Sequence, residues 1–150
     1  PKTEKIISYF LLLTMMSKNL CVQCGKCCRL TEMYVSTKDI SRILKNFKGC
    51  LQKEDFVEIN QDGTFQLKNV ENWCYFYDIE NQLCKIYEIR PRGCRFYPLI
   101  YDMEDNTCIL DEECPRSHLF YEKSNKTEKI CIELKKFLEK ELFLKLKEDV

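Results

Sequence analysis

Four of the eleven cysteines fall in one eight-residue stretch, C-V-Q-C-G-K-C-C at residues 21–28. They are Cys21, Cys24, Cys27 and Cys28. Two thiolates separated by two residues can bind one metal, because the tight turn between them directs both sulfurs and nearby backbone N–H groups the same way. Gly25 favours this turn, since glycine takes a positive φ without steric cost. The repeated spacing offers three ligands to a zinc ion or an iron–sulfur cluster, and Cys28, adjacent to Cys27, is expected to face a different centre or another edge of the same one.

A second cysteine-bearing stretch runs over residues 73–98. Aromatic residues around Cys74 predict a strand, Glu80-Asn81 predicts a turn, and Cys84 falls in the returning strand. The two cysteines are therefore expected to face each other across a hairpin.

Cys94 follows at the same ten-residue interval. One helical turn is predicted over residues 86–89, and it ends before Pro91 because proline pushes the preceding residue out of the helical region. Gly93 is expected to reverse the chain and present Cys94 on a turn. Together with one thiolate from the first loop, these three later cysteines make four ligands.

Cys114 is followed by a proline and is remote from the first loop. A cysteine followed by proline supplies a cluster ligand in bacterial ferredoxins, although there the motif is contiguous. His118, the single histidine, is a further candidate ligand or proton carrier, but a lone histidine is more often a surface residue.

Arg90, Arg92 and Arg95 surround Cys94, and Lys26 and Arg29 flank the first loop. Four thiolates on a divalent metal carry a net charge of about −2, so nearby cations lower the cost of burying such a site. The alternative is that these arginines are solvated surface residues. If the site binds an anionic cofactor or partner, we expect the three arginines to contact it.

The composition favours metal ligation over disulfides. The chain has eleven cysteines in 150 residues, and an odd number cannot all be paired in disulfides within one chain. Adjacent cysteines and C-x-x-C spacing are typical of metal sites in a reducing compartment, so we expect a cytoplasmic protein. Lysine plus arginine equal aspartate plus glutamate at 24 each, so no net charge attracts nucleic acid. Cys50 is interpreted as a core residue, and Cys108 as a core residue or a spare ligand.

An apolar run at residues 6–16 follows Lys2 and Lys5. A bilayer span needs roughly 20 apolar residues, and no small-residue cleavage site precedes the cysteine loop. We therefore expect a helix or strand packed on the core and no membrane association. An alternative start at Met15 or Met16 would place the cysteine loop near the N-terminus.

The remaining elements predict one α+β domain over residues 1–150, made of short hairpins, irregular cysteine loops and a long C-terminal helix. Ser36 and Asp39 form a capping pattern at the start of a helix that ends near Gly49. The other expected elements are a short strand at 33–35, hairpins at 56–67 and 98–110, and an amphipathic helix at 127–147. The domain divides into an N-terminal segment at 1–20, a cysteine core at 21–115 and a C-terminal helical segment at 120–148.

These motifs, in this order, resemble the YkgJ-type, or C-x-x-C-x-x-C-C, zinc- or iron-chelating domain family. The resemblance rests on the first loop, on Cys74, on C-K-I-Y-E-I-R-P-R-G-C-R-F-Y-P at residues 84–98, and on Cys114-Pro115. It implies that the metal ligands are Cys21, Cys24, Cys27, Cys28, Cys74, Cys84, Cys94 and Cys114, hereafter the ligand cysteines. Cys50, Cys108 and Cys131 fall outside the pattern. A related cysteine region in flagellin lysine N-methylase resembles an iron–sulfur site, but this chain is too short to contain that enzyme.

Three functions are consistent with these residues. The first is a protein that holds an iron–sulfur cluster, of the 4Fe–4S type, with or without a second metal, in electron transfer or as an accessory to a larger enzyme. The second is a structural zinc module that mediates protein interactions. The third is an iron–sulfur enzyme, related through the resemblance to methyl transfer. We expect a protein partner, and the balanced charge gives no reason to expect nucleic acid.

Overall fold

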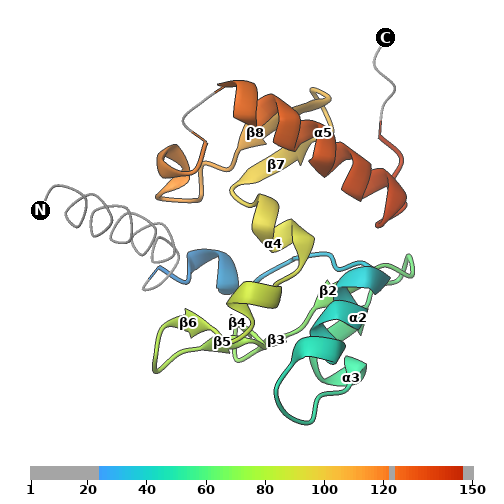
Figure 1. The fold of residues 1–150 in the computed structure, drawn as a ribbon, viewed down its shortest axis with the longest axis vertical. Helices are drawn as coiled ribbons and strands as arrows, with labels where there is room; N and C mark the ends of the chain where they lie inside the picture. Colours follow the sequence, from blue (N-terminus) through green and yellow to red (C-terminus); the bar gives the residue numbers. More distant parts are fainter. Residues whose placement is uncertain (1–23, 122–123, 147–150) are drawn as a thin grey trace, which may run out of the picture.

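The computed structural model describes residues 24–121 and 124–146. The apolar run at 6–16 and Cys21 lie outside the described residues. Within them the predicted α+β class is confirmed, because short helices alternate with two-stranded antiparallel sheets. Figure 1 shows two ends of the molecule with helix α4 (Arg92–Phe96) between them.

The first end is built on helix α2 (Thr37–Asn46) and the short helix α3 (Lys53–Phe56). The predicted capping pattern is confirmed, since Ser36 accepts a bond from the Asp39 amide while the Asp39 carboxylate accepts one from the Ser36 amide. Ile40 and Ile43 turn inward from α2, and Phe56 is fully buried beneath them. Strands β1 (Val57–Ile59) and β2 (Phe65–Leu67) form the predicted hairpin.

Two smaller hairpins carry cysteines of the second stretch, with a register that differs from the prediction. Cys74 ends the hairpin of β3 (Asn69–Val70) and β4 (Trp73–Cys74), where it pairs with Asn69. Cys84 ends the hairpin of β5 (Tyr77–Asp78) and β6 (Leu83–Cys84), where it pairs with Tyr77. The expectation that the two cysteines face each other across one hairpin is therefore wrong: the chain turns after Cys74, and Tyr77 begins the next strand.

The second end contains the predicted hairpin of β7 (Leu99–Asp102) and β8 (Thr107–Leu110), covered by helix α5 (Ser124–Lys140). Leu134 and Phe137 of α5 pack on Phe96 and Leu99 in a second hydrophobic cluster. The helix ends before the predicted residue 147, because the Glu141 and Leu142 amides both bond to the Phe137 carbonyl and the chain then leaves the helical path.

A disulfide between Cys108 and Cys131 joins β8 to α5, with Cα atoms 5.9 Å apart. This corrects the interpretation of Cys108 as a core residue or spare ligand. The bond was not predicted because the two cysteines are separated by 23 residues and share no motif spacing. Cys50 is exposed rather than buried.

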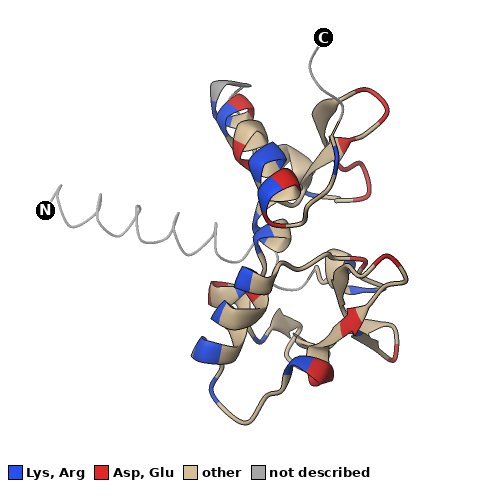
Figure 2. Ribbon diagram, turned by 90° about the vertical axis from the view of Figure 1, so that its right-hand side faces the viewer, with Lys and Arg blue, Asp and Glu red and all other residues tan. Residues whose placement is uncertain are grey.

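Charges of both signs are distributed over both ends of the molecule, in line with the equal numbers of basic and acidic residues (Figure 2). None of the helices in the described part of the chain is long and apolar enough to cross a bilayer.

Candidate metal centre

A cavity of about 350 Å³ lies between the two ends of the molecule. Its wall includes every ligand cysteine that the structure describes: Cys24, Cys27, Cys28, Cys74, Cys84, Cys94 and Cys114. These thiols come from the first loop, two hairpins, α4 and the turn after β8, so the fold gathers residues up to 90 positions apart (from 24 to 114).

The first loop has the turn that its sequence predicts. Gly25 takes a φ of 60°, and residues 26–28 form a short 3-10 helix, η1 (Lys26–Cys28), in which the Cys28 amide bonds to the Gly25 carbonyl at 3.0 Å. A side chain at Gly25 would overlap the hydroxyl of Tyr77. Tyr77 in turn stacks on Trp73, with ring centroids 4.7 Å apart. Glycine is therefore required both by the backbone and by the aromatic side chain packed on the loop.

Cys94 lies within helix α4 and not on the turn that was predicted. Gly93 is part of helix α4, where the absence of a side chain lets the Met33 sulfur pack against the helix backbone. A Cβ atom at this position would collide with that sulfur. The predicted turn before Pro91 is confirmed as a 3-10 helix, η2 (Tyr87–Ile89). Helix α4 thus brings Cys94 against the first hydrophobic cluster while Phe96 enters the second.

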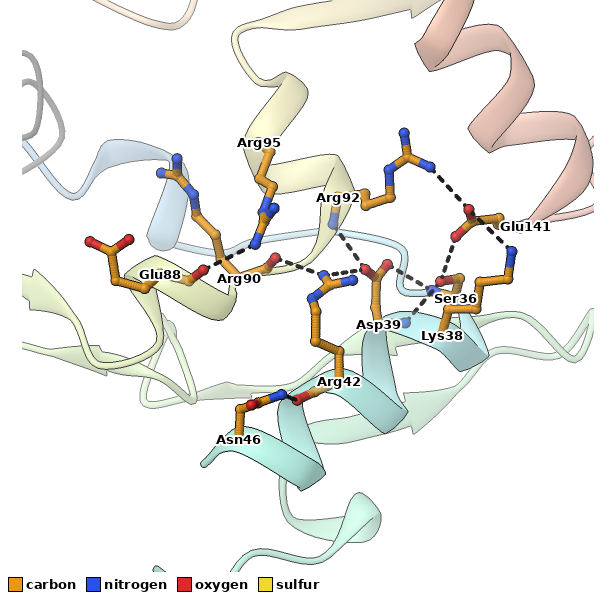
Figure 3. Close-up of polar contacts among 10 residues, drawn as sticks. All are labelled: Ser36, Lys38, Asp39, Arg42, Asn46, Glu88, Arg90, Arg92, Arg95 and Glu141. Atoms are coloured by element: carbon orange, nitrogen blue, oxygen red, sulfur yellow. Dashed lines mark hydrogen bonds and ion pairs between the residues drawn. The ribbon is translucent and has the colours of Figure 1, made fainter. Parts of the chain in front are cut away.

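A polar network fixes the chain on both sides of Pro91 (Figure 3). The carboxylate of Asp39, which is 0% exposed, accepts bonds from the Arg92 amide at 3.0 Å and from Arg42 Nη2 at 2.7 Å. Arg42 Nη2 also donates to the Arg90 carbonyl at 2.9 Å. The sequence showed Asp39 only as a helix cap, and nothing in its spacing indicated that it would also hold the segment before Cys94.

The adjacent thiols Cys27 and Cys28 form a hydrogen-bonded pair. The bond from Cys28, with a smaller contribution from the Arg90 cation, lowers the pKa of Cys27 to about 7. The same bond, followed by burial, raises the pKa of Cys28 well above its ordinary value. Of the two thiols, Cys27 is therefore the one that ionises first, and at a pH near 7 it is only partly ionised.

The other cavity thiols have raised pKa values, and burial is the largest cause for each. Burial raises the pKa of Cys74 to about 11, and it also raises the pKa of Cys84, Cys94 and Cys114. Neighbouring thiolates add to these shifts, because each charge repels the next across the apolar cavity. A metal cation that replaced the thiol protons would relieve this repulsion. A group of buried thiols close to one another therefore favours metal binding electrostatically.

The thiols are not arranged about a single point. Among residues 24–121 and 124–146, no group of three or more histidine, cysteine, aspartate or glutamate side chains is placed to hold one metal ion. His118 is exposed and does not line the cavity.

The structure separates the three arginines that the sequence grouped together. Arg90 lines the cavity. Arg92 pairs with Glu141 at 3.0 Å, and Arg95 donates to the Glu88 carbonyl at 3.0 Å (Figure 3). Neither of these two arginines lines the cavity. Several lining residues lacked any sequence signal for the site, among them Tyr77, Tyr97 and Phe120.

A cavity lined by cysteines from five separate segments, with cations at its edge, defines a cysteine-rich metal-chelating domain. The chain belongs to the CxxCxxCC family, described as "Putative zinc- or iron-chelating domain", whose model matches residues 20–131. This match confirms the resemblance noted from the cysteine motifs.

One curated relative is the uncharacterized protein MJ0661 of Methanocaldococcus jannaschii. It is 32% identical over 92 residues, which are 60% of this chain and 50% of the relative. The chain therefore spans about half the length of that protein. No solved structure matches the chain.

Proposed function

We propose that the cavity holds an iron–sulfur cluster of the 4Fe–4S type, ligated by cysteine thiolates, and that the protein serves in electron transfer or as an accessory to a larger enzyme. The observation that carries the proposal is the convergence of seven ligand cysteines on one cavity of about 350 Å³. Cysteine thiolates are the usual ligands of such clusters, and an apolar cavity excludes water from them.

The spread of the thiols favours a cluster over a single zinc ion. Four zinc ligands must lie about 2.3 Å from one point, and the described side chains have no such arrangement. A cluster distributes its ligands over several iron atoms, so its cysteines stand further apart.

The neighbours of each thiol suggest two ligand sets. Cys94 interacts electrostatically with Cys74, Cys84 and Cys27, whereas Cys114 interacts with Cys27 and Cys24. Cys27 belongs to both sets. We therefore propose an inner centre on Cys28, Cys74, Cys84 and Cys94, and an outer centre that includes Cys24 and Cys114, with Cys27 between them.

A structural zinc module is the second candidate. It is favoured by the Cys24-Gly25 turn, which resembles that of a zinc knuckle, and by the backbone hydrogen bonds to the thiols of Cys74 and Cys84. The hairpins around the site are also small, since their strands have only two residues. In that case the protein would act by binding another protein.

The test is the content of iron, zinc and acid-labile sulfide in protein purified without oxygen, together with its visible spectrum. A cluster predicts brown protein with iron and sulfide in equal amounts. Colourless protein with stoichiometric zinc and no sulfide would overturn the cluster and support the zinc module.

A further inference from the structure

Arg90 is the arginine of the network that lines the cavity, and its guanidinium forms no ion pair within the described residues. The guanidinium lies over the Tyr87 ring, 3.9 Å from the centroid, and its buried Nε, like that of Arg42, donates to no acceptor among the described residues. Arg42 and Arg92 each form an ion pair, whereas no ion pair in the described part of the chain involves Arg90. Burying an unpaired donor is costly, which indicates that a missing group completes the site.

The cavity wall beside Arg90 is mainly apolar. Met33, Phe76, Ile86 and Phe120 contribute to it, together with the ligand cysteines. An apolar pocket with a few placed polar groups is the usual form of a small-molecule site, and about 350 Å³ is at the small end of the range for such sites.

The charged residues of the wall favour an anion. Three of them are basic, Lys26, Arg90 and Arg116, and one is acidic, Glu88. The thiolates account for part of this excess, since the Arg90 cation acts to lower the pKa of Cys27, Cys84 and Cys94. It is not the largest cause for any of the three, and the buried Nε of Arg90 still has no hydrogen-bond acceptor among the described residues.

We propose that Arg90 binds the carboxylate of a small organic acid whose apolar body lies against the cavity wall beside the metal centre. The Nε and one Nη of a guanidinium form a planar fork that matches a carboxylate, and stacking on Tyr87 holds that fork in orientation. This inference rests on the proposed function for the neighbouring centre, and it specifies the class of molecule that the same cavity accepts.

The test is calorimetric titration of anaerobically purified protein with benzoate, with the neutral analogue benzamide, and with inorganic phosphate. We expect benzoate to bind at least tenfold more tightly than benzamide, because only benzoate has the charge, and more tightly than phosphate, which has no apolar body. Arg90→Met should weaken benzoate binding at least tenfold, and Arg90→Lys should weaken it less, since it keeps the charge without the fork. Arg95→Met is the matched control, because it makes the same charge change outside the cavity and should bind benzoate as the wild type does.

Metal content and melting temperature are measured on every variant. Equal benzoate binding by the wild type and Arg90→Met, or no binding of benzoate by the wild type, would overturn the proposal. Loss of metal by Arg90→Met and Arg90→Lys alike would also overturn it, and would assign Arg90 to the neutralisation of the thiolates. If the wild type holds no metal at all, the proposed function fails, while the same titration still reports whether Arg90 binds a carboxylate.

Discussion

At the scale of single residues, the Cys27–Cys28 pair is the most reactive feature of the site. Adjacent cysteines cannot both lose a proton easily, because two negative charges would lie side by side in an apolar cavity. The structure resolves this by making Cys28 the donor and Cys27 the acceptor, with Arg90 nearby. Cys27 therefore loses its proton at lower pH than Cys28 does, which makes it the first of the two to become a thiolate.

Reactivity toward iodoacetamide tests this assignment in protein stripped of metal. Only the thiolate reacts, so a lowered pKa shifts the rise in alkylation rate to lower pH. Cys27 should reach half its maximal rate near pH 7, while Cys74, with a pKa of about 11, should stay unreactive until the solution is strongly alkaline. Peptide mass spectrometry across pH 5–10 measures both, and a midpoint for Cys27 near its ordinary pKa of 9.0 would contradict the hydrogen-bonded pair.

Cysteine-to-serine variants test which thiols are ligands. Cys24→Ser and Cys94→Ser should each lower bound metal by roughly half or more, because a four-ligand centre does not survive the loss of a thiolate. Cys50→Ser is the control, since Cys50 is exposed and does not line the cavity. Elemental analysis of the purified variants measures the bound metal. Equal metal content in Cys24→Ser, Cys94→Ser and Cys50→Ser would refute the ligand set.

At the scale of elements, α2 holds the segment that carries Cys94. Its buried Asp39 caps its own helix and also accepts the Arg92 amide, so one carboxylate serves both the helix and the segment beside the cavity. Asp55 is a suitable control for Asp39, because it caps helix α3 in the same way but is exposed.

Asp39→Ala should therefore cost more stability than Asp55→Ala. Loss of a cap costs about 1 kcal/mol, and leaving the Arg92 amide and the partly exposed Arg42 without their acceptor adds about 1–3 kcal/mol. Urea unfolding should show a difference of this size between the two variants, and Asp39→Ala should also retain less metal. Equal losses of unfolding free energy would mean that the Arg92 and Arg42 contacts contribute little.

The disulfide between β8 and α5 gives a second prediction at this scale. A cross-link over a loop of this length stabilises a protein by about 2–4 kcal/mol. Cys131→Ala should lower the free energy of unfolding by that amount under non-reducing conditions, with Cys50→Ala unchanged. If mass spectrometry of the native protein finds Cys108 and Cys131 as free thiols, the cross-link is not formed and this prediction fails.

The sequence predicted helices and hairpins whose signals lie within a few neighbouring residues. It did not predict how these elements pack against one another. The α2 cap, both longer hairpins and the turn before Pro91 follow from residues within a few positions of one another. The pairing of Cys84 with Tyr77, the helical setting of Cys94 and the Cys108–Cys131 bond depend on contacts between distant segments. Sequence spacing carries no information on such contacts unless a motif fixes it.

At the scale of the whole molecule, seven of the eight cysteines that the family resemblance groups together line one cavity, and their role as metal ligands stays a prediction. Only the fold separates Arg90 from Arg92 and Arg95. The three arginines look equivalent in sequence because each lies close to Cys94. Their side chains diverge because α4 and η2 point them to different neighbours.

Removal of metal should destabilise the whole chain rather than one loop. Metal binding contributes directly to folding free energy when its ligands come from several segments. After treatment with a chelator, the melting temperature should fall by several degrees or more, and far-UV circular dichroism and tryptophan fluorescence should change together. Trp73 is the probe, since it stacks on Tyr77 beside the first loop. A melting curve unaffected by metal would show that the hydrophobic clusters alone carry the fold.

The position of Cys114 also affects how the protein is made. The first hydrophobic cluster is complete once residue 94 has left the ribosome, whereas Cys114 and Phe120 of the cavity wall emerge later. An emerging chain thus presents six of the seven described cavity thiols before the last part of the wall has been made.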